Sequence, residues 1–204
     1  MSWKEFLKDK RNRVEVLITL ILLSIVLISL TNFLNFVEAR KGAVLSDPIL
    51  NLFNPIDLTW LTFAIIYGSI VVAIATLFKN PKRLMFAILL YILMVAVRIA
   101  AMYLLPLEPP STMIALNDPF VEFFGSGQTL TKDLFFSGHT ATLFILFLVS
   151  ENKIIKSVFL ISTFMVAILV ILQHVHYSID VFAAVFFTYA CYKLILKFKI
   201  HYSL

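Results

Sequence analysis

Cysteine is almost absent from this chain, and charged side chains are scarce. The single cysteine, Cys191, lies deep in the last apolar run, so there is neither a disulfide framework nor a cysteine-based metal site. We interpret Cys191 as a small buried apolar residue. Charged residues make up only 14% of the chain, hydrophobic residues make up 61%, and the mean hydropathy is +0.96. This balance excludes an ordinary soluble domain and predicts an integral membrane protein.

A patch of positive charge suited to nucleic acid is also lacking. The net charge is +5, but the basic residues are spread over short segments beside apolar runs. That distribution is typical of the positive-inside rule of membrane proteins. We therefore expect the lipid bilayer as a partner and no nucleic acid. The sequence has no internal repeat, and it leaves the oligomeric state open, a homo-oligomer included.

The apolar residues gather into runs long enough to cross roughly 30 Å of hydrocarbon as a helix. They predict an all-α, polytopic protein with six transmembrane helices in one catalytic domain, residues 14–199. A basic, aromatic N-terminal segment, residues 1–13, is expected at the cytoplasmic interface, and residues 200–204 form a cytoplasmic tail. The first span is too long for a signal peptide and should be retained. The spans run from about Val14 to Val37, Leu58 to Phe78, Leu84 to Leu105, Leu134 to Ser150, Ile154 to Val175 and His176 to Lys197.

The segment from Pro106 to Lys132 is the longest stretch without a full span. It contains Pro109-Pro110, Asp118-Pro119 and Gly125-Ser126-Gly127, and only its middle, Met113 to Phe124, is apolar. Irregular backbone at membrane depth must be shielded by protein. We therefore predict a partly interfacial or re-entrant loop between helices 3 and 4 that shapes the mouth of a site.

Basic residues are distributed unequally between the two faces of this six-span arrangement. One face holds 13 of the 17 Lys and Arg residues, in the N-terminal segment, two turns and the C-terminal end. The opposite loops hold only Arg40, Lys41 and Lys132, while Arg98 lies inside a span. This predicts that both termini are cytoplasmic and that the opposite loops are exoplasmic, either periplasmic or lumenal.

Two histidine clusters stand at the ends of the hairpin formed by the fourth and fifth spans. One is Ser137-Gly138-His139-Thr140, and the other runs from His174 to Asp180. Two crossings between them bring both clusters to the exoplasmic face. Ionisable side chains at membrane depth are costly and usually functional. The sequence therefore predicts a site at this level of the bundle.

His176 and Asp180 are four residues apart, which places them on one helix face within hydrogen-bonding reach if the sixth helix begins at or before His176. A carboxylate on one imidazole nitrogen leaves the other nitrogen as a nucleophile or base. The alternative is an interfacial histidine beside an aspartate that the helix dipole favours. That alternative gives no reason for a second histidine cluster at the same depth, so we favour a catalytic pair.

Ser137 and Gly138 lie where the fourth span begins, and unpaired N–H groups at a helix start make an anion site. Ser137 can cap the helix while its hydroxyl contacts an oxyanion, and Gly138 allows close approach. Taken alone, the tetrapeptide is better explained by a plain helix cap. Its pairing with the second histidine cluster favours a phosphate-binding site.

Three further ionisable residues accompany these clusters. Arg98, toward the exoplasmic end of the third span, suits a phosphate bidentately, although snorkelling is an alternative. Asp133 either orients a histidine or Arg98, or marks the interface. His174 points away from His176 on a helix, which favours an interfacial or supporting role. A zinc site built from the histidines and Asp180 is a further alternative, but each member also has a metal-free role, so we expect neither metal nor other cofactor.

The spacing of these residues matches that of a known group of membrane enzymes. Asp133-Leu-Phe-Phe-Ser137-Gly-His139-Thr140 fits the pattern D-x-x-x-S-G-H-T, and the segment from His176 through Tyr177 to Asp180 fits H-Y-[ST]-x-D. The segment from Arg98 to Pro106 looks like the third span of the same group. The chain thus resembles the sphingomyelin synthase family, within the type-2 phosphatidic acid phosphatase superfamily, over about Ile65 to Lys197.

The resemblance implies a metal-independent phosphotransfer in two steps. His176, held by Asp180, would attack the phosphorus of a membrane phospholipid and form a phosphohistidine. His139 would protonate the leaving group and then activate the incoming hydroxyl of a lipid alcohol or water. Arg98, the Ser137 hydroxyl and the Gly138 backbone would hold the phosphoryl oxygens, with Asp133, Tyr177 and His174 in support.

The sequence departs from the family pattern at two places. Thr131-Lys132 stands where the animal enzymes have Cys-Gly, and Leu169-Val170 stands where the phosphatase branch often has Ser-Arg, so Arg98 would have to supply that charge. The acceptor therefore stays open between a ceramide-like alcohol, diacylglycerol and water. A lipid transporter or a non-catalytic lipid-binding relative is a further alternative. Three intact catalytic positions, and the lack of inverted repeats, argue against it.

Overall fold

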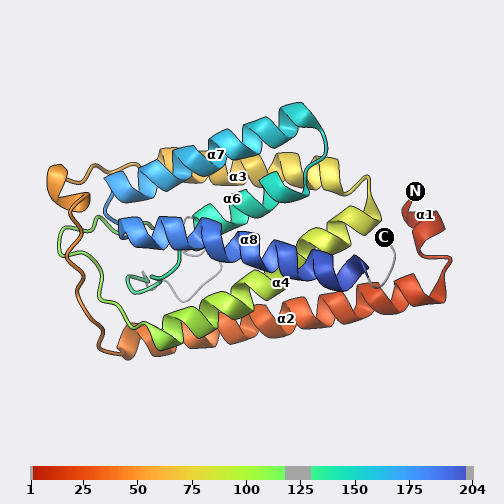
Figure 1. The fold of residues 1–204 in the computed structure, drawn as a ribbon, viewed down its shortest axis with the longest axis horizontal. Coiled ribbons are helices and arrows are strands. Elements are labelled where there is room, and N and C mark those ends of the chain that lie inside the picture. The colour runs from red at the N-terminus through yellow and green to blue at the C-terminus, as the bar shows by residue number, and fades with distance from the viewer. Residues whose placement is uncertain (1, 118–129, 201–204) are drawn as a thin grey trace.

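The computed structural model describes residues 2–117 and 130–200, with side chains up to residue 197, as a bundle of helices along one long axis (Figure 1). Within that part of the chain there is no β-strand, only an isolated bridge between Ala43 and Leu107. The elements are α1 Trp3–Phe6, α2 Lys10–Ala39, the 3-10 turn η1 Leu50–Leu52, α3 Thr59–Leu77, α4 Pro81–Leu104, α6 Gly138–Val149, α7 Lys153–Leu172 and α8 Ser178–Ile200.

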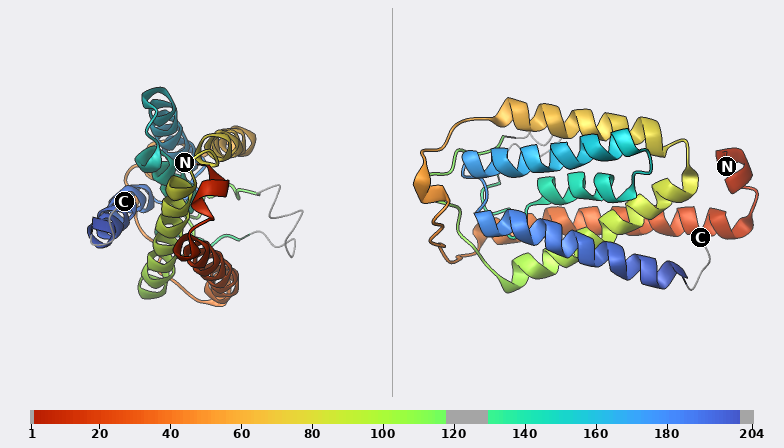
Figure 2. Two further views of the ribbon diagram at one scale, coloured as in Figure 1. Left: turned by 90° about the vertical axis from the view of Figure 1, so that its right-hand side faces the viewer. Right: turned by 45° about the horizontal axis from the view of Figure 1, so that its top comes forward.

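Helix α6 lies inside the bundle and α2 lies at its edge. Helix α6 packs against α3, α4, α7 and α8, whereas α2 packs mainly on α4 (Figure 2). The core joins α4, α6 and α7 through residues such as Leu90, Leu143 and Val166, which are completely buried. Most apolar side chains of α2 stay exposed. A helix that is apolar on its outer face requires a lipid environment.

Five helices in the described residues are long and apolar enough to cross a membrane, namely α2, α3, α4, α7 and α8. Helix α6 is apolar but has only 12 residues. This corresponds to about 18 Å of helix, short of roughly 30 Å of hydrocarbon. The all-helical integral membrane class is therefore supported, while the predicted sixth full span is not confirmed.

The fourth predicted span begins later than expected, at Gly138 rather than Leu134. The Ser137 side chain accepts a hydrogen bond from the Thr140 N–H and so caps the helix. The residues before it are irregular, although apolar. Protein shields that backbone, since Leu134 and Phe136 are buried, and this is the condition for irregular chain at membrane depth. Hydropathy alone does not detect such a cap.

The fifth helix ends at Leu172 rather than at the predicted Val175. His174 adopts the left-handed conformation with φ of 54°. Its N–H donates to the Ile171 carbonyl, and the Val175 N–H donates to the Val170 carbonyl. This is a Schellman ending in which histidine occupies the position that usually takes glycine. Because no glycine stands at this position, the sequence did not indicate the turn.

Polar caps explain why other helices begin before their apolar runs. Helix α2 begins at Lys10 rather than Val14 because the Asp9 side chain accepts from the Arg11 N–H. Asn80 caps α4 and Asn152 caps α7 in the same way. The predicted N-terminal segment, residues 1–13, thus contains α1 and the first turn of α2, and residues 201–204 of the predicted tail lie outside the described residues.

Part of the predicted interfacial or re-entrant loop, residues 118–129, also lies outside the described residues. The described remainder, 106–117 and 130–132, contains no helix. It pairs with the segment from Arg40 to Leu52, which we call the strap. The Ala43 N–H donates to the Pro106 carbonyl, and the Glu108 N–H donates to the Ala43 carbonyl, each at 2.9 Å.

Gly42 allows this close approach of the strap. A Cβ at position 42 would lie 2.5 Å from the Leu107 carbonyl carbon. The Gly42 N–H donates to the Glu108 carboxylate at 2.8 Å. That hydrogen bond, together with the Lys132 ammonium, lowers the pKa of Glu108. The loops that follow α2 and α4 are thereby joined at one end of the bundle.

Gly42→Ala should destabilise the protein by about 1–3 kcal/mol, because the added methyl overlaps backbone that cannot rotate away. The measurement is thermal unfolding of the purified protein in detergent. Gly68→Ala is the matched control, since no heavy atom lies within 4 Å of its added Cβ. In the middle of α3 that change should be neutral or stabilising, by up to about 1 kcal/mol. Equal melting temperatures for Gly42→Ala and the parent would contradict the packing argument.

Candidate functional site

His176 and Asp180 form a buried pair at the start of α8. His176 Nδ1 lies 3.2 Å from Asp180 Oδ2, and the two residues are 2% and 0% exposed. The predicted condition, that the helix includes His176, is wrong, because α8 begins at Ser178. The pair forms anyway since Asp180, in the first turn, reaches back toward the residues that precede the helix.

The same carboxylate oxygen also organises the backbone. The Tyr177 N–H donates to Asp180 Oδ2 at 3.2 Å, and the Asp180 N–H donates to the Tyr177 carbonyl. This reciprocal pattern is half of a capping box. The second oxygen, Oδ1, is buried and has no hydrogen-bond partner among the described residues. The aspartate therefore fixes the start of α8 and the His176 ring together.

The start of α6 is attached directly to this pair. The Ser137 N–H donates to the Asp180 carbonyl at 3.1 Å, so the two sequence motifs meet through the backbone. Ser137 is completely buried, and its oxygen also accepts from the Thr140 hydroxyl at 3.1 Å. The predicted capping role of Ser137 is confirmed by this geometry. The N–H groups of the first turn of α6 thus lie beside the start of α8.

Arg98 reaches the start of α6 from the third long helix, α4. Its Nε donates to the Phe136 carbonyl at 2.6 Å, and its Nη2 pairs with Asp133 Oδ1 at 2.6 Å. A Cβ added at Gly138 would lie 3.3 Å from Nη1, so this glycine leaves room for the guanidinium. Arg98 is 4% exposed, which contradicts the snorkelling alternative.

Asp133 therefore accompanies Arg98 rather than a histidine. The carboxylate balances the charge of a guanidinium that is otherwise costly at this depth. The pair also holds the irregular backbone between Asp133 and Phe136, which leads into α6. Arg98 consequently has a structural task besides the predicted one on phosphate.

His139 occupies the first turn of α6, next to Gly138. It is half-buried, and its ring meets the edge of Phe63 on α3 at 6.1 Å between centroids. The helix that carries it is joined to Asp180 at its cap. The structure thus brings the beginning of the His139 helix to the His176–Asp180 pair, as the hairpin argument predicts.

His174 and Tyr177 face the loops. Thr112 Oγ1 lies 2.6 Å from His174 Nδ1, and the ring packs on Phe53. Burial lowers the pKa of His174 despite the nearby Asp47, which favours a neutral ring. The Tyr177 hydroxyl donates to the Glu108 carbonyl at 2.9 Å and accepts from the Leu45 N–H. Burial raises the pKa of Tyr177, so the phenol keeps the proton that it donates.

Asp47, in the strap, is a residue that the sequence argument missed. Its Oδ2 accepts from the Ser178 N–H at 2.6 Å, and its Oδ1 accepts from the Ile49 N–H at 2.9 Å. The residue is only 7% exposed. A carboxylate at this place caps α8 from outside the helix. The one sequence signal at Asp47 is the proline that follows it, Pro48. An Asp-Pro pair indicates an ordinary turn equally well.

No group of three or more histidine, cysteine, aspartate or glutamate side chains that could hold a metal ion occurs in residues 2–117 and 130–197. His139, His176 and Asp180 therefore do not form a ligand cluster of the kind that the zinc alternative requires. What the arrangement offers is an imidazole oriented by a carboxylate, a second imidazole, a guanidinium and a helix start.

Asp47→Ala should lower the stability of the protein by about 1–2 kcal/mol at pH 7, because it removes the cap of α8. Burial acts to raise the pKa of Asp47, but the hydrogen bonds from Ser178, Ile49 and Leu50 outweigh it and lower that pKa. The stabilisation is therefore complete above the ordinary carboxyl pKa of about 4 and is lost as the pH falls through the lower folded value.

Thermal unfolding of both proteins from pH 7 down to pH 3 measures this difference. Asp57→Ala is the control, since Asp57 also accepts a helix-start N–H, from Thr59, but is exposed and does not touch α8. A difference between Asp47→Ala and the parent that stays constant down to pH 3 would show that the carboxylate charge has no part in it.

Comparison with known proteins gives a match to one family model. Residues 132–198 match the family model described as PAP2 superfamily C-terminal. That range includes both histidine motifs and helices α6, α7 and α8. No curated protein and no solved structure matches the chain. The match supports a place for this chain in the type-2 phosphatidic acid phosphatase superfamily, and with it a membrane-bound enzyme of the lipid phosphatase or phosphotransferase type.

Proposed function

We propose that this chain is a sphingomyelin synthase-like lipid phosphotransferase, which moves a phospho-headgroup from a phospholipid to a lipid alcohol without a metal. The observation that carries the proposal is the buried His176–Asp180 pair, joined through the Asp180 carbonyl to the N–H of Ser137. One carboxylate orients an imidazole beside a helix start that suits an anion. Arg98 supplies a buried guanidinium at the same helix start.

In the first step His176 acts as the nucleophile. Asp180 engages Nδ1 and leaves the Nε2 lone pair to form a bond with phosphorus. As that bond forms, the bond from phosphorus to the oxygen of the leaving alcohol breaks. His139 gives its proton to this oxygen, so a neutral alcohol departs. Asp180 stabilises the positive charge that develops on the His176 ring.

In the second step the acceptor hydroxyl takes the phosphoryl group. His139, now neutral, removes the proton of the hydroxyl, and the oxygen attacks phosphorus while the bond to Nε2 breaks. The N–H groups at the start of α6, the Ser137 hydroxyl and Arg98 Nη1 would hold the phosphoryl oxygens in both steps. His176 and His139 then return to their original protonation states.

The burial of the nucleophile favours a lipid acceptor over water. His176 is 2% exposed and lies between helix starts in a bundle whose outer surface is apolar. A site closed to bulk solvent protects a phosphohistidine from hydrolysis. Hydrolysis of a lipid phosphate, with water as acceptor, is the alternative function. Supplying a labelled phospholipid with and without a lipid alcohol separates them, because only transfer requires the alcohol.

His139→Asn should slow turnover by about 10²–10⁴-fold and let a phosphoenzyme accumulate, because a good leaving group needs little acid in the first step. The label from a donor with such a leaving group should lie on His176, resist alkali and survive EDTA. Mass spectrometry of the digested protein locates it. His176→Asn is the matched control and should carry no label with any donor.

Three outcomes would overturn this mechanism. Phosphate on His139 instead of His176 would exchange the two roles. A label that disappears when chelator is added would introduce a metal that the proposal does without. Turnover of His176→Asn at the parental rate would reject covalent catalysis altogether.

The side of the membrane is a separate prediction. We propose that both termini are cytoplasmic and that the site faces the exoplasmic side, because of the unequal Lys and Arg distribution. A cysteine at Leu52, which is 79% exposed in η1, should react with an impermeant thiol reagent on intact cells. A cysteine at exposed Lys79 should react only after lysis. Native Cys191 is 4% exposed and should stay silent. The reverse labelling would assign the site to the cytoplasm.

A further inference from the structure

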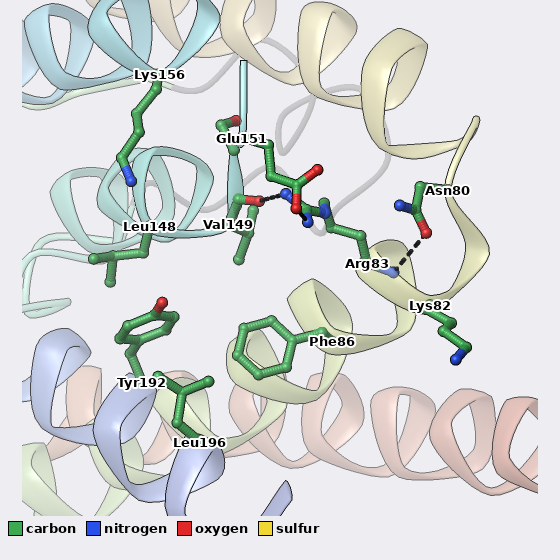
Figure 3. Close-up of a pocket in the computed structure, with 11 residues that line it drawn as sticks. Asn80, Lys82, Arg83, Phe86, Leu148, Val149, Glu151, Lys156, Tyr192 and Leu196 are labelled. Carbon is green, nitrogen blue, oxygen red and sulfur yellow. Dashed lines mark hydrogen bonds and ion pairs between the residues drawn. The ribbon is translucent and has the colours of Figure 1, made fainter. Parts of the chain in front are cut away.

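A cavity lies at the end of the bundle opposite to His176. It has a volume of about 460 Å³ and opens between the start of α4, the turn from α6 to α7 and the last part of α8 (Figure 3). Cavities that bind small organic ligands usually have volumes of about 300–1,000 Å³. The histidine site uses the other ends of α4, α6 and α8. This cavity is therefore distinct from it.

Two cations face the cavity from different helices. Arg83, in the first turn of α4, donates to the Val149 carbonyl at 3.1 Å and pairs with Glu151. Lys156, in the first turn of α7, lies with its ammonium 5.1 Å from the centre of the Phe147 ring. Figure 3 shows Arg83 and Lys156 approaching from two sides. Glu151 is 73% exposed and opposes only one of the two charges.

The inner wall of the cavity is apolar with one hydroxyl. Phe86 and Tyr192 pack edge to face at 5.9 Å, and Leu148 and Leu196 complete this wall. In Figure 3 the Tyr192 hydroxyl points toward the side where Lys156 lies. Cations thus occupy the helix ends, while apolar side chains lie further along the bundle axis. A phospholipid has the same order, with its phosphate at the interface and its chains below.

We propose that this cavity binds the headgroup of an anionic phospholipid, separate from the lipid that reacts at the histidine site. The phosphate lies between Arg83 and Lys156, and the glycerol and the beginning of the acyl chains lie along Phe86 and Leu196. The guanidinium forms charge-assisted bonds to a phosphate oxygen. A zwitterionic lipid binds more weakly because its ammonium group would enter a field that is already positive.

An occupant at this place would contact the four helices α4, α6, α7 and α8. Helices α4, α6 and α8 line the cavity at one end, and at the other end they supply Arg98, Gly138 and Asp180. The lipid therefore bridges helices whose relative position sets the geometry of the distant site. Its expected effect is on stability.

Native mass spectrometry of the full chain in non-ionic detergent tests the proposal, with dioleoylphosphatidylglycerol or dioleoylphosphatidylcholine added in steps. Lys156→Gln should bind the anionic lipid about five- to tenfold more weakly than the parent, the change expected from one lost cation. Lys153→Gln is the matched control, because Lys153 is exposed and does not line the cavity. Both variants leave the histidine site intact, so a difference between them reports this cavity.

A second variant tests the space rather than the charge. Leu148→Trp fills the cavity without changing any charge, and it should also weaken binding of phosphatidylglycerol, while circular dichroism checks that the bundle is folded. Phosphatidylglycerol should raise the melting temperatures of the parent and of Lys153→Gln. The rise should be smaller for Lys156→Gln.

Three results would overturn the proposal. One is equal binding of phosphatidylglycerol to the parent, Lys156→Gln and Lys153→Gln. Another is equal binding of phosphatidylglycerol and phosphatidylcholine by the parent. The third is displacement of the lipid from the parent by millimolar inorganic phosphate, which would assign the cavity to free phosphate. Retention of the lipid under phosphate supports binding of the whole phospholipid.

Discussion

Asp180 is the residue on which the geometry of the candidate site depends. Its Oδ2 lies 3.2 Å from His176 Nδ1 and accepts from the Tyr177 N–H, while its carbonyl accepts from the Ser137 N–H. One buried residue thus fixes the start of α8, the orientation of an imidazole and the attachment of α6. Hydrogen bonds to a charged group in a poorly solvated interior are stronger than at a surface. The orientation of the His176 ring is consequently set by the fold itself.

Around Asp180, backbone that is not helical needs hydrogen-bond partners at membrane depth. Arg98 supplies them for the residues before α6, through the Phe136 carbonyl and Asp133. At the start of α8, Asp47 of the strap accepts from the Ser178 N–H. The Tyr177 hydroxyl in turn accepts from the Leu45 N–H of the strap and donates to the Glu108 carbonyl. In lipid, an unpaired N–H or carbonyl costs several kcal/mol. Arg98, Asp47 and Tyr177 therefore each hold backbone that would otherwise lack a hydrogen-bond partner.

The two ends of the bundle have different character. At one end, around the start of α6, lie helix starts, imidazoles and the Arg98–Asp133 ion pair. The other has an excess of basic over acidic side chains around an open cavity (Figure 3). The family match covers the helices that connect them, residues 132–198. Helices α4, α6 and α8 contribute to both ends, so the candidate site and the cavity share the same helices.

Composition and spacing were enough to predict the membrane class, the approximate helices and the candidate site residues. Long apolar runs are costly in water, and ionisable residues are costly in lipid, so both leave a strong signal in composition. The spacing of His176 and Asp180 predicted their contact. The assumed condition, that the helix includes His176, is wrong because α8 begins at Ser178. Hydropathy did not predict the start of α6, which the Ser137 cap defines, or the end of α7, which the left-handed His174 defines.

Which side chains meet depends on how the helices and loops pack together. The tertiary structure paired Asp133 with Arg98, removed the snorkelling alternative and identified Asp47 as the cap of α8. The Arg98–Asp133 contact spans 35 positions of the sequence and the Asp47–Ser178 contact spans 131. No local sequence pattern encodes contacts of this length. The cavity at Arg83 and Lys156 likewise depends on how the four helices α4, α6, α7 and α8 converge. Periodicity describes one helix at a time, whereas a site arises where the polar requirements of several segments are satisfied together.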